Sequence, residues 1–328
     1  MANSSMNRGL DRRRIGLYVA FSFGIAWANA LAIHQTGGLV RSPEIIPGTG
    51  LTMAMVLLAT GYMWAPALAH ILTRAITREG WQGMFLEPRF RKGWPYWLAG
   101  WLAPAILTLA GAIVFFMIFP RYFDPSLKIV KDMIMRAERV SGRPVPIIPW
   151  MMVVFQAAQA VLIAPVINGL FTFGEEFGWR AYLLPKLLPL GGRKASVLMG
   201  MIWGAWHWPI IAMGHNYGLD YQGAPWLGMC VMVWFTLVVG TFLGWITLRG
   251  GSVWPAVISH GAINGIAGIG ILFIKGRPSS LLGPMPTGII ASIPWALLAA
   301  WIFLRRGALE PGPSAALGAL GIKRGRVV

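Results

Sequence analysis

Long apolar stretches recur along almost the whole chain, and they restrict what it can fold into. Eight are long enough to cross a hydrocarbon core of about 30 Å as helices. Of the 328 residues, 56% are hydrophobic and only 12% are charged, which is typical of a membrane protein. We therefore predict an all-α membrane protein, a polytopic bundle of about eight transmembrane helices. The stretches lie near 15–33, 51–73, 94–119, 149–172, 195–213, 226–248, 254–274 and 286–304.

The chain is strongly basic, with a formal net charge of +17. In a soluble protein this charge would suggest nucleic acid, but most of the Lys and Arg residues lie in short loops between the apolar stretches. They are typical of topology determinants that face anionic lipid, so we expect the lipid bilayer as a partner and no nucleic acid. Their distribution favours an inside location for both ends of the chain.

Three segments follow from this pattern. Residues 1–14 are interpreted as a basic cytoplasmic N-terminus, 15–304 as the membrane domain, and 305–328 as a disordered basic tail. The short loops and the high Ala, Gly and Arg content are typical of a multi-pass protein of a bacterial cytoplasmic membrane. The first stretch also resembles a signal peptide, but it is long for one, so we expect it to remain as a span. Residues 126–140 predict an amphipathic helix on the membrane surface.

Two acids and an arginine lie at the end of the fourth stretch, in Gly174-Glu175-Glu176-Phe177-Gly178-Trp179-Arg180. Ionised groups inside a membrane are costly and normally pair or mark function. If the helix continues, Glu176 and Arg180 are four residues apart on one face and can form an ion pair. Glu175 then points about 100° away and remains available for chemistry.

Two histidines lie inside later stretches. His207 is in the fifth and His260 is in the seventh, where Asn264 follows four residues later on the same helix face. Together with the acids and the arginine, these polar residues are too costly in three apolar stretches to be packing accidents, so they indicate a shared functional site. The other histidines are near stretch ends or loops, and we interpret them as interfacial: His34, His70 and His215.

Small residues predict close contact among the stretches that follow the acids. Gly200 and Gly204, Gly240 and Gly244, and Gly261 and Gly265 form three GxxxG pairs in the fifth, sixth and seventh stretches. Such pairs let helix backbones approach closely in a membrane.

Glutamate with histidine suits the activation of water, and a neutral histidine with an asparagine amide can donate hydrogen bonds to an oxyanion. This is the chemistry of peptide-bond hydrolysis. The same side chains, Glu175, His207 and His260, could instead bind zinc as two histidines and one carboxylate with an open position. Both chemistries fit the sequence. A thiolate cluster does not, because Cys230 is the only cysteine.

At these residues the chain resembles the type II CAAX prenyl endopeptidase family of intramembrane glutamate proteases, which includes bacteriocin-processing and immunity-related proteins. The family pattern is EExxxR, then FxxxH, then HxxxN, on separate membrane helices. The acidic motif and the His260 motif match, and His207 matches except that Trp203 replaces the usual phenylalanine. The motifs cover residues 175–264.

The resemblance implies a role for each residue around an intramembrane active-site cavity. Glu175 would activate the attacking water, His207 would help to hold it, and His260 and Asn264 would bind water or the oxyanion. The Glu176 ion pair would fix the helix. Family members have been described both as metalloproteases and as metal-free enzymes, and we expect no cofactor here. The expected substrate is a peptide or a membrane-anchored protein, prenylated or not.

Two functions from other classes also fit some of these features. Paired acids and histidines in spans also build the proton relays of transporters, but the two halves of this chain do not mirror each other. An inactive membrane scaffold or immunity protein would not need every expected polar residue. The signatures HExxH, GxGD and GxSG of other intramembrane proteases are absent from the sequence.

Overall fold

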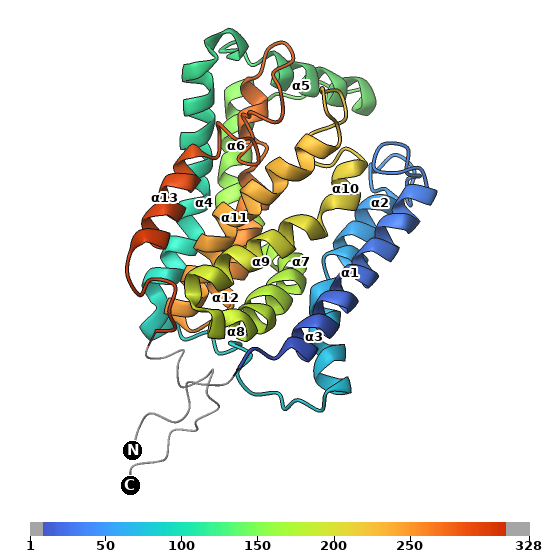
Figure 1. The fold of residues 1–328 in the computed structure, drawn as a ribbon. Helices are drawn as coiled ribbons and strands as arrows, with labels where there is room; N and C mark the ends of the chain where they lie inside the picture. Colours follow the sequence, from blue (N-terminus) through green and yellow to red (C-terminus); the bar gives the residue numbers. More distant parts are fainter. Residues whose placement is uncertain (1–8, 313–328) are drawn as a thin grey trace.

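The computed structural model describes residues 9–312, in which every regular element is a helix (Figure 1). This confirms the predicted all-α fold. The α-helices are α1 (Arg12–Gln35), α2 (Met53–Val56), α3 (Ala65–Ile76), α4 (Phe90–Ile118), α5 (Lys128–Ser141), α6 (Pro149–Leu162), α7 (Ala164–Gly178), α8 (Leu184–Leu187), α9 (Gly192–Trp206), α10 (Trp208–Ala212), α11 (Trp226–Gly250), α12 (Trp254–Ile266) and α13 (Ile293–Leu304). Short π-helical or 3-10 segments adjoin them: η1 (Leu57–Tyr62), η2 (Pro120–Tyr122), η3 (Trp179–Leu183), η4 (Leu188–Leu190) and η5 (Ile269–Phe273).

Fewer helices than predicted are long enough to cross a membrane alone. By length and composition, five helical segments of the described residues qualify, and a sixth does so if α6 and the helix that follows it, bent by 49°, count as one span. The predicted count of eight full-length spans is higher than this, because the fifth and eighth stretches form the shorter helices α9 and α13. These have only 15 and 12 residues.

Prolines explain where two predicted spans are interrupted. Helix α6 ends before Ile163, two residues ahead of Pro165, and α9 ends before His207, two residues ahead of Pro209. Proline cannot donate a backbone hydrogen bond, and it disfavours helical geometry in the residue before it. In contrast, Pro104 lies within α4 without ending that helix.

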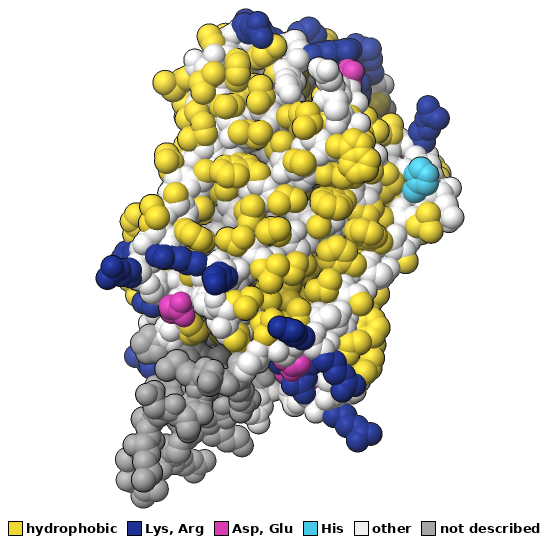
Figure 2. Space-filling view, viewed as in Figure 1, with side chains coloured by type: hydrophobic (Ala, Val, Ile, Leu, Met, Phe, Trp, Pro, Cys, Tyr) yellow, Lys and Arg dark blue, Asp and Glu magenta, His cyan; other side chains and the backbone are white. Residues whose placement is uncertain are grey.

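The surface has the two-zone character of a membrane protein. A broad belt of hydrophobic side chains covers the visible face, and Lys and Arg side chains gather at its two ends (Figure 2). The start of α1 and the end of α13 lie at the same end of the bundle (Figure 1). This arrangement fits the prediction that the chain enters and leaves the membrane domain on one side, while the identity of that side stays a prediction.

Glycines let the central helices approach one another. A Cβ atom on Gly178 would lie 2.4 Å from Cβ of Pro66, so α7 packs closely on α3. On the other side of α7, a Cβ on Gly261 would lie 2.7 Å from the Pro165 carbonyl oxygen of α7. Helix α9 packs on α11, where a Cβ on Gly204 would meet Cα of Val233 at 2.7 Å. The GxxxG glycines of the fifth stretch therefore contact the sixth, whereas Gly261 of the seventh contacts α7.

The predicted amphipathic helix at 126–140 is present as α5. Leu127 and Val130 are buried against the bundle. Asp124 precedes the helix, and its carboxylate accepts hydrogen bonds from the Ser126 hydroxyl at 2.6 Å and from the Lys128 amide at 2.8 Å. These bonds hold the pKa of Asp124 below its ordinary value. The carboxylate therefore caps the start of α5, while contact of α5 with a lipid surface stays a prediction.

Residues 305–312, the first part of the segment predicted to be a disordered tail, are described in the structure and contact the helical bundle, while disorder of the tail stays a prediction. Ala308 and Leu309 are buried, and the Gly312 amide donates to the Leu248 carbonyl at 3.0 Å. Residues 313–328, and residues 1–8 of the basic N-terminus, lie outside the described residues.

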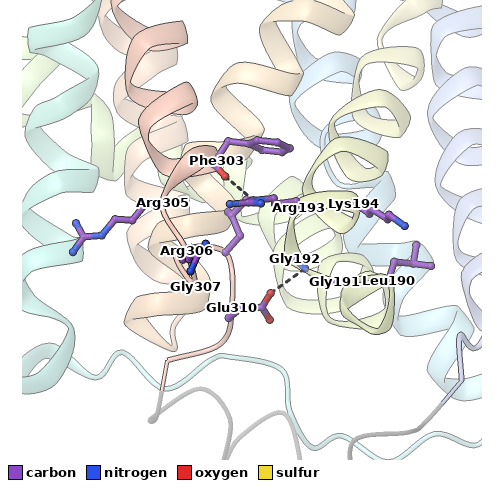
Figure 3. Close-up of a pocket in the computed structure, with 11 residues that line it drawn as sticks. Leu190, Gly191, Gly192, Arg193, Lys194, Phe303, Arg305, Arg306, Gly307 and Glu310 are labelled. Carbon is purple, nitrogen blue, oxygen red and sulfur yellow. Dashed lines mark hydrogen bonds between the residues drawn. The ribbon is translucent and has the colours of Figure 1, made fainter.

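A pocket of about 340 Å³ separates the start of α9 from the end of α13 (Figure 3). Inside it, Arg193 Nε donates to the Phe303 carbonyl at 2.7 Å, and a Glu310 carboxylate oxygen lies 3.4 Å from the Gly192 amide. These contacts tie the segment after α13 to the start of α9, the helix that carries His207 near its other end.

Candidate active site

The polar residues singled out in the sequence come together deep in the bundle. Glu175 and Glu176 lie at the end of α7, and Arg180 lies one turn later in η3. Trp203 is in the last turn of α9 with His207 immediately after that helix, and His260 is in α12. Each of these side chains is buried within the protein. We call these six residues the catalytic cluster, after the role that the sequence predicts for most of them: Glu175, Glu176, Arg180, Trp203, His207 and His260.

One carboxylate oxygen of Glu176 contacts both the Arg180 guanidinium and the His260 imidazole. Its Oε1 atom accepts from Arg180 Nη1 at 2.9 Å and from His260 Nδ1 at 2.8 Å. The predicted ion pair between Glu176 and Arg180 is therefore formed, with both side chains fully buried. The contact with His260 was not predicted. It links α7 to α12 and fixes the orientation of the imidazole.

Glu175 has a different partner. Its Oε2 atom accepts a hydrogen bond from the indole Nε1 of Trp203 at 2.8 Å, and its other oxygen makes no hydrogen bond within the described residues. The Arg180 guanidinium carbon lies 4.3 Å from the centroid of the Trp203 ring. The two adjacent acids thus have separate partners, as the predicted 100° between them requires, and Glu175 keeps one carboxylate oxygen unbonded.

The two histidines each use Nδ1, and within residues 9–312 the Nε2 atom of each has no hydrogen-bond partner. Nδ1 of His207 lies 2.8 Å from the backbone carbonyl oxygen of Trp203, which can only accept, so Nδ1 carries a proton. Nδ1 of His260 is taken as the donor in its contact with Glu176 Oε1, the oxygen that also accepts from Arg180 Nη1. In the neutral rings Nε2 is therefore a lone-pair acceptor. This suits the binding of a water proton, whereas donation to an oxyanion would require a protonated ring.

Asn264 is the one predicted site residue that the cluster does not engage. It lies one helical turn after His260, but its side chain is exposed and makes no hydrogen bond within the described residues. The asparagine that contacts α12 is instead Asn168 of α7, whose Nδ2 donates to the Gly261 carbonyl at 3.0 Å. A role for Asn264 at the oxyanion stays a prediction.

The side chains considered as zinc ligands do not form a ligand set. Within residues 9–312, no three His, Cys, Asp or Glu side chains are grouped so that they could hold a metal ion. This includes Glu175, His207 and His260. The residues present therefore do not fit the zinc site considered from the sequence.

Sequence reasoning missed the part played by Trp203. The sequence comparison noted Trp203 only as a replacement for the usual phenylalanine, but its N–H donates to Glu175 and its ring is close to both histidines. The ring centroids are 5.4 Å from His260 and 5.8 Å from His207. The sequence did contain a sign of this role, because tryptophan, unlike the usual phenylalanine, has an N–H group that can donate a hydrogen bond.

His70 was also misjudged. Predicted to be interfacial, it is completely buried in α3, where Arg74 Nε donates to its Nε2 atom at 2.6 Å. Its Nδ1 atom lies 3.0 Å from the Phe177 carbonyl oxygen of α7. This histidine braces α3 against the helix that carries the two acids.

The segment that holds these motifs is similar to known proteins. Residues 149–266 match the model of the type II CAAX prenyl endopeptidase Rce1-like family. The chain is also 32% identical over 93 residues to a protein named CAAX prenyl protease 2 from Methanococcus maripaludis. That match covers 27% of this chain and 34% of the relative, so the chain spans about a third of the relative's length. Residues 149–266, which hold the whole catalytic cluster, are therefore similar to the Rce1-like type II CAAX prenyl endopeptidases.

Proposed function

We propose that this protein is an intramembrane endopeptidase that uses Glu175 to activate water against a peptide bond of a membrane-associated protein. The observation that carries the proposal is the pairing pattern of the two acids. Glu176 is neutralised by Arg180, while Glu175 keeps an oxygen that makes no hydrogen bond within the described residues. A carboxylate that is not paired with a cation can take a proton from water more readily than a carboxylate that is paired with one. The family match supports peptidase chemistry in general.

In the proposed reaction, water attacks the scissile carbonyl carbon as Glu175 takes one of its protons. The other O–H of the water donates to the Nε2 lone pair of His207 or His260, and this hydrogen bond orients the water. The carbonyl oxygen becomes an oxyanion, for which the Asn264 amide is the proposed donor. Collapse of the tetrahedral intermediate breaks the C–N bond, and Glu175 returns its proton to the leaving amine. Glu176 holds Arg180 and His260 in place through its Oε1 atom.

The substrate class proposed from the relative's name is a protein with a prenylated C-terminal CAAX sequence. The alternative within the same chemistry is an unmodified peptide. Two synthetic peptides of one sequence, with and without a prenyl group on the cysteine, separate these cases. We expect mass spectrometry to detect the released C-terminal fragment with the purified wild-type protein. Faster cleavage of the prenylated peptide would support the CAAX assignment.

The test of the mechanism is Glu175→Gln, which is nearly isosteric but cannot take a proton. We expect hydrolysis to fall by a factor of at least about 100 while expression and the melting temperature stay close to those of the wild type. Turnover at the wild-type rate would remove Glu175 from the mechanism. Cleavage of neither peptide by the wild-type protein would instead support the inactive scaffold.

A further inference from the structure

Trp203 contacts every other polar side chain of the catalytic cluster except Glu176. Its N–H bonds Glu175, its ring face lies under the Arg180 guanidinium, and its ring centroid lies 5.8 Å from that of His207 and 5.4 Å from that of His260. The side chain is only 2% exposed. A phenylalanine at this position, the residue expected from the family pattern, would keep the ring contacts but could not donate a hydrogen bond.

The contact matters because the site has two neighbouring acids and one arginine. Arg180 can neutralise either carboxylate, and of its three nitrogens only Nη1 has a hydrogen-bond partner in the described residues. Helical spacing favours Glu176, which lies four residues before Arg180, but it does not hold Glu175 away from the guanidinium. The Trp203 indole does this, because its N–H bonds Glu175 while its π face attracts the guanidinium.

We propose that Trp203 is a positioning residue that assigns the two acids to different roles, holding Glu175 by its N–H and seating Arg180 beside Glu176 by its ring. This inference rests on the proposed function, since the role it gives Glu175 is that of the base. Without the N–H, Glu175 is free to rotate about its side-chain bonds and to compete with Glu176 for Arg180. The base would then spend less time oriented for attack, while the surface that binds substrate would be unchanged.

The test variant is Trp203→Phe, which removes the N–H and keeps an aromatic ring. The matched control is Trp295→Phe in α13, where another fully buried tryptophan has an Nε1 atom without a hydrogen-bond partner in the described residues. Both variants shrink a buried indole by the same atoms. We expect Trp203→Phe to lower kcat by about 10- to 100-fold with KM changed by less than about threefold, since misplaced groups cost rate more than binding. The control should change neither by more than about twofold.

A second readout does not depend on activity. The indole ¹⁵N–¹H resonance of Trp203, identified by its loss in Trp203→Phe, should shift upfield in Glu175→Gln because the acceptor loses its charge. The Trp295 resonance should not move. Equal kcat values for Trp203→Phe and the wild type, or an unshifted Trp203 resonance, would overturn the inference. The proposed function fails separately, if Glu175→Gln keeps wild-type turnover.

Discussion

Two polar clusters in this protein, one buried and one partly exposed, contain a histidine, an arginine and a glutamate, and they differ in which side-chain atoms lack a hydrogen-bond partner. In the catalytic cluster, His260 uses only Nδ1 and leaves Nε2 with no hydrogen-bond partner in the described residues. In the second cluster, around Glu79, both nitrogens of His70 are used. The Glu79 cluster comprises His70, Arg74, Glu79, Tyr182 and Lys186.

The two glutamates show the same contrast. Glu79 contacts Arg14 at 3.4 Å, Arg74 at 3.8 Å, Tyr182 at 3.1 Å and also Lys186, so it joins α1, α3, η3 and α8. In the catalytic cluster, two glutamates share a single arginine. Glu79 thus contacts three cationic side chains. In the catalytic cluster, Arg180 pairs with Glu176, and Glu175 is bonded by an indole N–H instead of a cation.

Under the proposed function, this difference separates a structural polar cluster from a reactive one. A histidine with both nitrogens bonded cannot bind a water or a substrate without breaking a contact, so its bonds serve to fix the helices. A histidine fixed through one nitrogen presents the other in a defined direction. Residue type alone does not distinguish the two, because each cluster has the composition of an active site.

The largest expected effect that tests the difference between the two clusters is the loss of stability when an arginine is removed from each. Arg180→Ala should lower the free energy of unfolding by about 3–5 kcal/mol, because Glu176 would be left buried without its cation. Arg74→Ala should cost less, since Glu79 keeps Lys186 and Arg14 as partners. Thermal melts and denaturant titrations in mixed micelles measure both. Equal losses for the two variants would mean that the clusters do not differ in cation supply.

Replacing each histidine by glutamine tests the unbonded nitrogen directly. His260→Gln can still donate to Glu176 but has no lone-pair nitrogen, so we expect turnover to fall by about 100-fold. His70→Gln should leave the turnover of folded protein within about twofold of the wild type. Peptide cleavage, normalised to folded protein, is the measurement. A comparable loss of turnover in both variants would show that the unbonded nitrogen of His260 does not distinguish the two histidines in catalysis.

A smaller effect is expected when the structural histidine is replaced by a ring that cannot hydrogen-bond. His70→Phe keeps the packing against the Phe177 and Tyr182 rings, whose centroids lie 4.3 and 4.5 Å away. It leaves Arg74 Nε and the Phe177 carbonyl without their present partner, so we expect a loss of about 2 kcal/mol in the free energy of unfolding. Unchanged stability in a denaturant titration would show that these two bonds do not brace α3 against α7.

The two clusters also show which contacts can be predicted from the sequence and which cannot. The pairing of Glu176 with Arg180 was predictable because it depends only on helical spacing, and the grouping of acids and histidines followed from the cost of polar groups in apolar stretches. The bond from Glu176 to His260 joins residues 84 positions apart, and that from Trp203 to Glu175 joins residues 28 apart. Such contacts depend on the rotation of each helix about its axis, which spacing within a single stretch does not give.

The fold shows the same limit. Hydropathy located the helical segments, but it did not show that α9 stops before His207, because an apolar composition continues through the break. Hydropathy also placed His70 near a stretch end, where an interfacial position was the simplest interpretation. Its burial depends on α7 packing across α3, and that packing depends on Gly178, which a one-dimensional pattern does not connect with Pro66.

The smallest effect is expected from chelation, and it tests whether the unbonded nitrogens of the site serve water or a metal. Prolonged treatment of the purified protein with a strong chelator should leave most of the peptide-cleaving activity, with elemental analysis showing less than stoichiometric zinc. This expectation rests on Glu175, which is held by an indole N–H, and on the lack of a three-residue ligand group among the described residues. One zinc per chain in the wild type, absent in His260→Ala and needed to restore activity after chelation, would contradict it. His70→Ala provides the control, because both of its nitrogens are already bonded and its loss should not change the zinc content.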